Sequence, residues 1–165
     1  MTASFDRFID GSDPSLVVVT AAVDGEQAGC LVGFHSQASI EPELYAVWLS
    51  RANRTMEVAS RAERLAVHYL EHDQLWIAEH FGSLTGDEVD KFAGVDWAPG
   101  PHGLPLIDAC PHHLVLERVE LLDVGSADHV CWLGRVDTAV VDHGVGKPFR
   151  LADASELSPG HEADG

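Results

Sequence analysis

Two long alternating segments near the end of the chain constrain its fold more than any other feature. Residues His113–Asp123 and His129–Val141 alternate apolar with polar side chains, and the turn residues Gly125-Ser126 separate them. A period of two residues is typical of β-strands that bury one face. The second segment alternates over thirteen residues, which is long enough for a strand to bend around a barrel. The two segments therefore predict a long antiparallel hairpin.

Shorter apolar segments upstream of this hairpin are rich in β-branched residues, which favour strands. The strands predicted from them are Leu16–Ala22, Gln27–Phe34, Leu44–Ser50 and Leu65–Leu70. Asp24-Gly25 is typical of a tight turn between the first two. Helices are predicted at Asn53–Arg61 with Asn53 as N-cap, at Asp73–Phe81 with Asp73 as N-cap and, as a single turn, at Asp87–Phe92. This order favours a mainly β fold, a small antiparallel barrel with short inserted helices, over a doubly wound sheet.

Glycine and proline indicate where the remaining segments depart from regular strands. Trp97–Pro111 contains four prolines and two glycines, so it is expected to be a structured loop. Gly29 and Gly33 lie on one face of the second predicted strand, which indicates close approach by another backbone or a ligand. Residues 1–152 are predicted to form a single domain and residues 153–165 a polar C-terminal tail.

Composition and cysteine usage predict a cytoplasmic protein that does not bind membranes. No apolar run approaches the roughly 20 residues needed to cross a bilayer. The first residues lack the basic region and apolar stretch of a signal peptide. Cys30, Cys110 and Cys131 form no CxxC pair, so each is predicted to be a small buried residue in a reducing compartment.

The strongly acidic composition restricts the ligands that the chain binds. The net charge is −17, from 27 acidic against 10 basic residues. Such a surface repels phosphate backbones, so no nucleic-acid partner is predicted. A phosphorylated small molecule would need a local concentration of basic residues. The sequence also lacks the GxGxxG, GK[ST] and GxSxG motifs of dinucleotide-binding folds, P-loop proteins and α/β hydrolases.

The most informative stretch runs from Gly33 to Thr55. Its first half places amide and hydroxyl side chains after a strand, where they suit the polar edge of a planar heterocycle. Its second half leaves a strand at Ser50 and begins a helix through Arg51, Asn53, Arg54 and Thr55. Hydroxyls, guanidinium groups and helix N-terminal amides bind phosphate monoesters. On spacing alone, an ordinary loop followed by a capped helix and solvated arginines is a slightly better explanation.

The same residues resemble the flavin reductase family, FMN-binding split barrels related to the small component of two-component monooxygenases. The matching positions are Gly33-Phe34, Ser39, Pro42, Ser50, Thr55, Val67–Leu70, Asp73-Gln74, Ala78, Phe81, Asp90–Phe92, Gly103–Leu106, Asp128-His129 and Gly134. The resemblance covers about residues 14–140. Two positions depart from the family pattern: Glu43 replaces the second proline of a Pro-Pro pair, and Ala127 replaces the glycine of a Gly-Asp-His turn.

The resemblance implies an antiparallel split β-barrel that binds FMN, with FAD as the alternative flavin, and uses NAD(P)H as co-substrate. The residues implied to line the isoalloxazine are Gly33, Phe34, His35, Ser36, Gln37 and Ser39. Those implied to hold the ribityl chain and phosphate are Ser50, Arg51, Asn53 and Thr55. Phe81 would lie near the ring edge, from the same or the other subunit. His129 would be a catalytic helper near the face that the nicotinamide approaches.

The family also implies a homodimer and a monooxygenase partner that receives reduced flavin. Exposed aromatic surface from Trp48, Trp76 or Trp132 would be buried in the dimer. Two alternatives stay open. One is a flavin- or deazaflavin-binding protein without reductase activity of its own. The other is a metal-binding domain, but His68 falls inside a predicted strand and His72 beyond its end, so no metal site is predicted.

Overall fold

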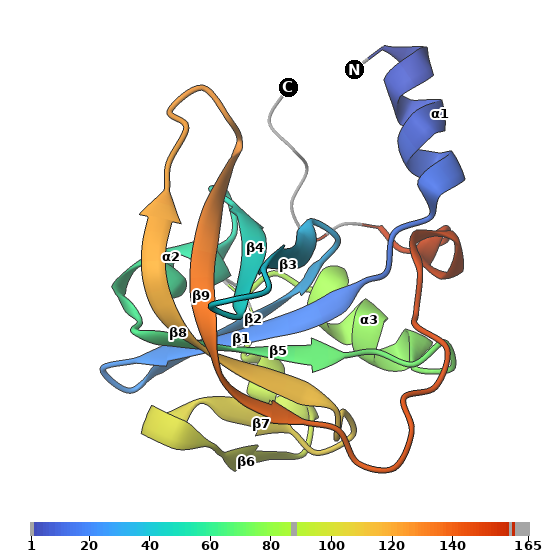
Figure 1. Ribbon diagram of the computed structural model, residues 1–165. Helices are drawn as coiled ribbons and strands as arrows, with labels where there is room; N and C mark the ends of the chain where they lie inside the picture. Colours follow the sequence, from blue (N-terminus) through green and yellow to red (C-terminus); the bar gives the residue numbers. More distant parts are fainter. Residues whose placement is uncertain (1, 87–88, 159, 161–165) are drawn as a thin grey trace.

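A single curled antiparallel sheet organises the computed structural model, which describes residues 2–86, 89–158 and 160 (Figure 1). The sheet has seven strands in the order β2-β1-β5-β8-β9-β4-β3. Their bounds are β1 Val17–Val23, β2 Glu26–Val32, β3 His35–Ser39, β4 Leu44–Ser50, β5 Arg64–Tyr69, β8 His113–Leu122 and β9 His129–Val140. The two edge strands, β2 and β3, follow each other directly in the chain, and β2 also contacts β4. The predicted mainly β fold, an antiparallel split barrel with short inserted helices, is confirmed.

The predicted strands and main helices are present, each within two residues of the predicted bounds. The β8–β9 hairpin pairs over most of its length, with register shifts after Val115 and Arg118. Asp24 and Gly25 both have positive φ, 51° and 79°, as the predicted tight turn requires. Helix α2 spans Arg54–Arg61, and the Asn53 side chain accepts a hydrogen bond from the Thr55 N–H at 2.9 Å. Helix α3 spans Leu75–Gly82.

Two apolar clusters lie on opposite faces of the sheet. The cluster inside the barrel includes fully buried Trp132 and Leu65 and packs against α2. The second cluster lies between the outer face of the sheet and α3, and it buries Ile77 and Phe81 on one side of that helix as predicted. A Cβ atom at Gly29 would come within 2.9 Å of Cε1 of Phe81, so this glycine makes room for an aromatic ring of α3.

Three elements differ from the sequence prediction. The segment expected to follow a strand as a polar loop is itself the edge strand β3, paired with β4 from His35↔Val47 onward. The expected loop Trp97–Pro111 contains a small hairpin of β6, Trp97–Pro99, and β7, Pro105–Ile107. Its prolines are tolerated because the hairpin has only two strands, and both therefore have an edge.

The ends of several helical segments also need correction. Gln74, not Asp73, occupies the N-cap of α3, and it makes no side-chain capping bond. The turn predicted over residues 87–92 falls partly on residues outside the described range, and a short 3₁₀ helix covers Lys91–Gly94. Further 3₁₀ turns span Pro101–Gly103 and Leu151–Ala154. Helix α1, Ala3–Ser12, was not predicted, and it projects from one end of the barrel without burying any residue (Figure 1).

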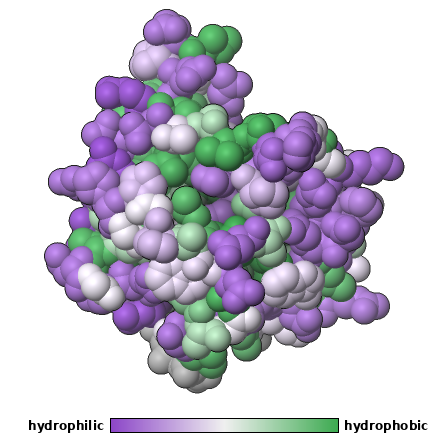
Figure 2. Space-filling view, turned by 90° about the horizontal axis from the view of Figure 1, so that it is seen from below, coloured by the Kyte–Doolittle hydropathy of each residue, from purple (hydrophilic) through white to green (hydrophobic). Residues whose placement is uncertain are grey.

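The surface and the three cysteines are as the composition predicts. Hydrophilic residues cover most of the face seen in Figure 2, with hydrophobic residues scattered among them. All three cysteines are buried and unpaired, as predicted. Among the described residues, no helix combines the length and apolar character that a membrane span requires.

Candidate active site

Two adjoining cavities follow the edge strand β2 to the start of α2. The narrow cavity has a volume of about 100 Å³ and is lined by Cys30, Leu31, Val32, Gly33, Phe34, Trp48, Leu49, Ser50, Asn53 and His129. The wide cavity has a volume of about 360 Å³ and is lined by Gly25, Gln27, Ala28, Gly29, Arg54, Thr55, Gly86, Val89, Asp90, Lys91 and Phe92. Residues 27–29 line the wide cavity and residues 30–34 line the narrow one, so the two cavities follow each other along the chain from β2 onward, and together they are called the β2 groove.

The narrow cavity brings together five of the predicted site residues: Gly33, Phe34, Ser50, Asn53 and His129. The Phe34 ring is 55% exposed and lies against the His129 ring, with 4.8 Å between the ring centroids. The backbone of Phe34 is fixed, because its carbonyl accepts a 2.8 Å hydrogen bond from the Trp48 N–H.

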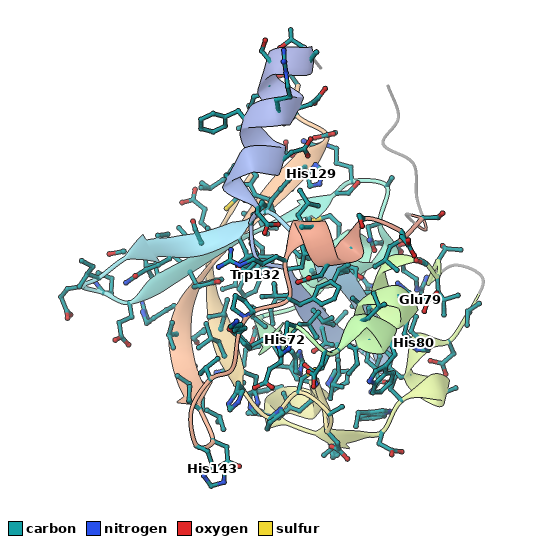
Figure 3. All side chains as sticks on the ribbon, turned by 90° about the vertical axis from the view of Figure 1, so that its right-hand side faces the viewer. His72, Glu79, His80, His129, Trp132 and His143 are labelled. Atoms are coloured by element: carbon teal, nitrogen blue, oxygen red, sulfur yellow. The ribbon has the colours of Figure 1, made fainter. Side chains whose placement is uncertain are left out.

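His129 is oriented by the residue before it. Its Nδ1 atom lies 2.7 Å from Oδ1 of Asp128, and this hydrogen bond holds the pKa of Asp128 below its usual value. An ionised carboxylate only accepts, so Nδ1 carries the hydrogen of this bond. In Figure 3, His129 lies below α1 and apart from His72, His80 and His143. Ser50 of β4 pairs with His129 of β9, which places both at one end of the narrow cavity.

The wide cavity is lined by two cationic residues, Arg54 and Lys91, together with Thr55 and the acidic residue Asp90. Lys91 is only 5% exposed, and its Nζ donates hydrogen bonds of 3.0 Å to the carbonyls of Gly29 and Phe81. Arg54 pairs with Glu26 at 3.3 Å and lines the cavity with its side chain. The sequence prediction included Arg54 in the stretch suited to phosphate but not among the residues implied by the family resemblance, and it assigned no binding role to Lys91. The signal for Arg54 was its closeness to Arg51 at the start of the helix, and the signal for Lys91 was the family match at Asp90–Phe92.

Thr55 and Cys30 meet beneath the groove. Burial raises the pKa of the Cys30 thiol, and a hydrogen bond to the Thr55 side chain offsets part of this rise. Thr55 itself is 1% exposed at the first turn of α2, although it contributes to the wall of the wide cavity. The predicted phosphate-side residue Thr55 therefore lies next to Arg54 and Lys91.

Several predicted site residues lie outside the groove. The Arg51 guanidinium binds Asp123 and the Ala127 carbonyl. His35 is held between the Ser15 carbonyl, 2.8 Å from Nε2, and the Tyr45 hydroxyl, 2.7 Å from Nδ1. Burial lowers the pKa of this histidine and raises that of Tyr45. Of the other predicted residues, Gln37 and Ser39 line a separate cavity that also includes Tyr45. Ser36 is exposed. Phe81 belongs to α3 and is buried.

The histidines do not form a metal site in the described part of the chain, where no cluster of three or more metal-ligating side chains is found. Fully buried His68 uses both ring nitrogens: Nδ1 lies 3.2 Å from the Val18 carbonyl, and Nε2 accepts from the Ile107 N–H at 3.1 Å. His72 is exposed beyond the end of β5.

Most of the chain matches a known protein family. A profile described as "Flavin reductase like domain" matches residues 13–155. The chain belongs to this family. The matched range contains both cavities and every strand, so the resemblance found in short motifs extends across the barrel. It also contains all of the predicted site residues.

Individual relatives of this flavin reductase domain include reductase subunits and flavin-binding proteins. The stachydrine N-demethylase reductase subunit Stc3 of Rhizobium meliloti is 28% identical over 128 residues, which are 76% of this chain and 54% of that protein. The NADH:FAD oxidoreductase SgcE6 of Streptomyces globisporus has a TM-score of 0.72 at 29% identity, with 85% of each chain covered. An FMN-binding protein from Thermus thermophilus has a TM-score of 0.76 at 25% identity, covering 86% of this chain and 80% of its own. The chain thus spans about half the length of the curated relative named first.

Proposed function

We propose that this flavin reductase domain is an NAD(P)H-dependent flavin reductase that binds FMN along the β2 groove. The observation that carries the proposal is the succession of two chemically different cavities along one stretch of chain, residues 27–34. One is narrow and lined by Phe34, Trp48 and His129. The other is wide and lined by Arg54 and Lys91, in a chain whose net charge is −17. This is the local concentration of cations that a phosphorylated ligand needs.

The FMN phosphate would lie in the wide cavity against Arg54, Thr55 and Lys91, and the ring would lie in the narrow cavity. The residues present fit such a ligand, because Lys91 holds a buried positive charge at the wall of the wide cavity. The narrow cavity, at about 100 Å³, is smaller than the roughly 300 Å³ at which ligand pockets begin. Its mouth would therefore open by rotation of the Phe34 side chain away from His129.

Bound flavin would supply the atom that accepts hydride from the nicotinamide. The protein would contribute binding and orientation, and no protein group would need to donate a proton for hydride transfer. His129 would pack against the nicotinamide or hydrogen-bond to its amide, with the ring orientation set by Asp128. Phe34 and Trp48 would exclude water from the same end of the groove.

Removal of the Arg54 guanidinium is expected to weaken binding of the phosphate selectively. Arg54→Ala should lower FMN affinity about ten- to a hundredfold, which corresponds to a charge-assisted contact of roughly 1.5–3 kcal/mol. Riboflavin, which lacks the phosphate, should lose less than about threefold. Titration of the apoprotein with FMN, FAD and riboflavin measures these affinities. Equal weakening of FMN and riboflavin would place the phosphate elsewhere, and Arg61→Ala on the same helix is the matched control.

The same titration decides between the two flavins. The wide cavity, at about 360 Å³, is larger than one phosphate group requires, so it also has room for part of the second nucleotide of FAD. We propose FMN as the preferred ligand because Arg54 and Thr55 of the wide cavity directly follow Asn53, which lines the narrow cavity. FAD binding at least tenfold tighter than FMN would overturn this choice.

Substitution of His129 is expected to reduce turnover without affecting flavin binding. His129→Ala should leave FMN affinity nearly unchanged and slow flavin reduction by about tenfold, equivalent to about 1.4 kcal/mol of transition-state stabilisation. Stopped-flow reduction by NADH and by NADPH in both proteins measures the effect and also identifies the preferred nicotinamide. An unchanged rate removes His129 from the site. If no NAD(P)H is oxidised with or without FMN, the alternative of a flavin- or deazaflavin-binding protein without reductase activity replaces the proposal.

We further propose a cytoplasmic homodimer that supplies reduced flavin to a monooxygenase. Reductase subunits among the relatives support the partner, and three buried, unpaired cysteines fit a reducing compartment. Trp132 is fully buried in the barrel, so of the three tryptophans suggested for the interface only Trp48 and the 52% exposed Trp76 remain. Light scattering should give twice the mass of 17.8 kDa at micromolar concentration. A stable monomer would contradict the dimer.

A further inference from the structure

Arg51 connects three parts of the β8–β9 turn to the end of β4. Its Nε donates a 2.7 Å hydrogen bond to the Ala127 carbonyl, and its two terminal nitrogens bind both carboxylate oxygens of Asp123. Its backbone N–H donates to the Asp128 carbonyl at 2.9 Å. One residue therefore contacts the end of β8, the tip of the turn and the start of β9. The Arg51 side chain lines a cavity with Met56, Leu121 and Val130 that is separate from the groove.

Little else fixes the shape of this turn. Residues 122–126 are exposed, so no apolar packing holds them against the barrel. Within the turn, the Ala127 N–H donates to the Val124 carbonyl at 2.7 Å. Directly after the tip come Asp128 and His129, whose carboxylate and imidazole are hydrogen-bonded to each other. The conformation of the turn thus sets the direction in which this pair faces the narrow cavity.

We propose that Arg51 is a positioning residue for flavin reduction: it clamps the β8–β9 turn so that Asp128 holds His129 at the mouth of the narrow cavity. The proposal rests on the proposed role of His129 in this groove. It replaces the role suggested by the sequence, in which Arg51 binds the flavin phosphate.

The chemistry of the clamp is specific to arginine. The planar guanidinium binds both Asp123 oxygens and still directs Nε to a carbonyl, whereas the single ammonium of lysine lacks this fork. The side chains of Arg51 and Asp123 are 39% and 54% exposed, and exposed ion pairs contribute little to overall stability. Loss of the clamp should therefore change the turn and the reaction without unfolding the barrel.

The test compares Arg51→Ala, Arg51→Lys and Asp123→Asn with the control Arg61→Ala, an exposed arginine on α2 outside the groove. In the ligand-free protein, ¹⁵N NMR of the His129 imidazole reports which ring nitrogen carries the hydrogen. We expect the Nδ1-protonated form in the parent and in the control, and a mixture of tautomers in Arg51→Ala and Arg51→Lys. Hydrogen exchange of residues 124–128 should become faster in the same variants, while the melting temperature changes by less than about 3 °C.

Kinetics supply the second part of the test. Arg51→Ala should keep FMN and riboflavin affinities within about twofold and slow flavin reduction by about three- to tenfold. Because Arg51 acts through His129, the double variant Arg51→Ala/His129→Ala should be no slower than His129→Ala alone. Additive losses, an unchanged His129 tautomer or a selective loss of FMN affinity would each overturn the clamp. If His129→Ala leaves reduction unchanged, the proposed role of His129 fails, and the NMR and exchange results still decide whether Arg51 holds the turn.

Discussion

Lowering the pH from 7 to 5 is expected to destabilise the protein by about 2 kcal/mol through one residue, His68. This side chain is fully buried between β1 and the β6–β7 hairpin, and burial lowers its pKa to about 3. An exposed histidine in the unfolded chain has a pKa near 6.5. Between these two values the unfolded state binds one more proton than the folded state. Stability is therefore fully present above pH about 6.5 and falls by about 1.4 kcal/mol per pH unit as the solution is acidified.

The pH dependence of urea unfolding in His68→Gln isolates this contribution. The glutamine amide offers a donor and an acceptor but does not titrate. As the pH falls, the free energy of unfolding of the variant should therefore decrease less steeply than that of the parent, by the contribution of one proton, about 1.4 kcal/mol per pH unit. Its lower stability at neutral pH does not affect this slope. His72→Gln, at an exposed position four residues away, should keep the parent slope. Parallel curves for the parent and His68→Gln would show that His68 does not remain neutral in the folded protein.

Elements with an apolar face were predictable from the sequence, and elements without one were not. Strands β2, β8 and β9 alternate and β1 is rich in β-branched residues, and all four appear within two residues of their predicted bounds. Strand β3 is polar and its three central residues are exposed, so no alternation distinguishes it from a loop. Helix α1 buries no residue, and therefore its sequence carries no pattern set by packing.

Some residues of the candidate site were predictable from the sequence, and the separate roles of Arg51 and Arg54 were not. Ser50 was found because it ends a strand whose position the pattern determines, whereas Phe34 and His129 were implied by the family resemblance. The register of the sheet pairs Ser50 with His129, and all three residues line one cavity. Arg51 and Arg54 lie three residues apart, and spacing does not distinguish them. Arg51 turns toward Asp123, which is 72 positions away in the chain, and no local signal reveals that partner. Only the folded structure assigns one arginine to the turn and the other to the groove.

Replacement of Lys91 by methionine is expected to reduce both the stability and the phosphate recognition of the protein. The ammonium group donates to the carbonyls of Gly29 and Phe81, joining the edge strand β2 to the end of α3. Hydrogen bonds to charged groups contribute about 1.5–3 kcal/mol each, so the free energy of unfolding of Lys91→Met should fall by about 3 kcal/mol. Methionine keeps the length of the apolar stem, and the Phe92 ring beside it should stay packed against Phe81.

The same substitution removes a positive charge from the wall of the wide cavity. Its effect on ligand affinity therefore shows whether Lys91 binds the phosphate as well as joining β2 to α3. If Lys91 also attracts the phosphate, FMN affinity should fall at least tenfold more than riboflavin affinity. Lys147 is the other lysine of the chain and is exposed, so Lys147→Met should change stability by no more than about 0.5 kcal/mol. Urea unfolding and flavin titration on both variants give the two quantities. Equal losses of FMN and riboflavin affinity would restrict Lys91 to joining β2 and α3, because a purely structural lysine shapes the groove for both ligands alike.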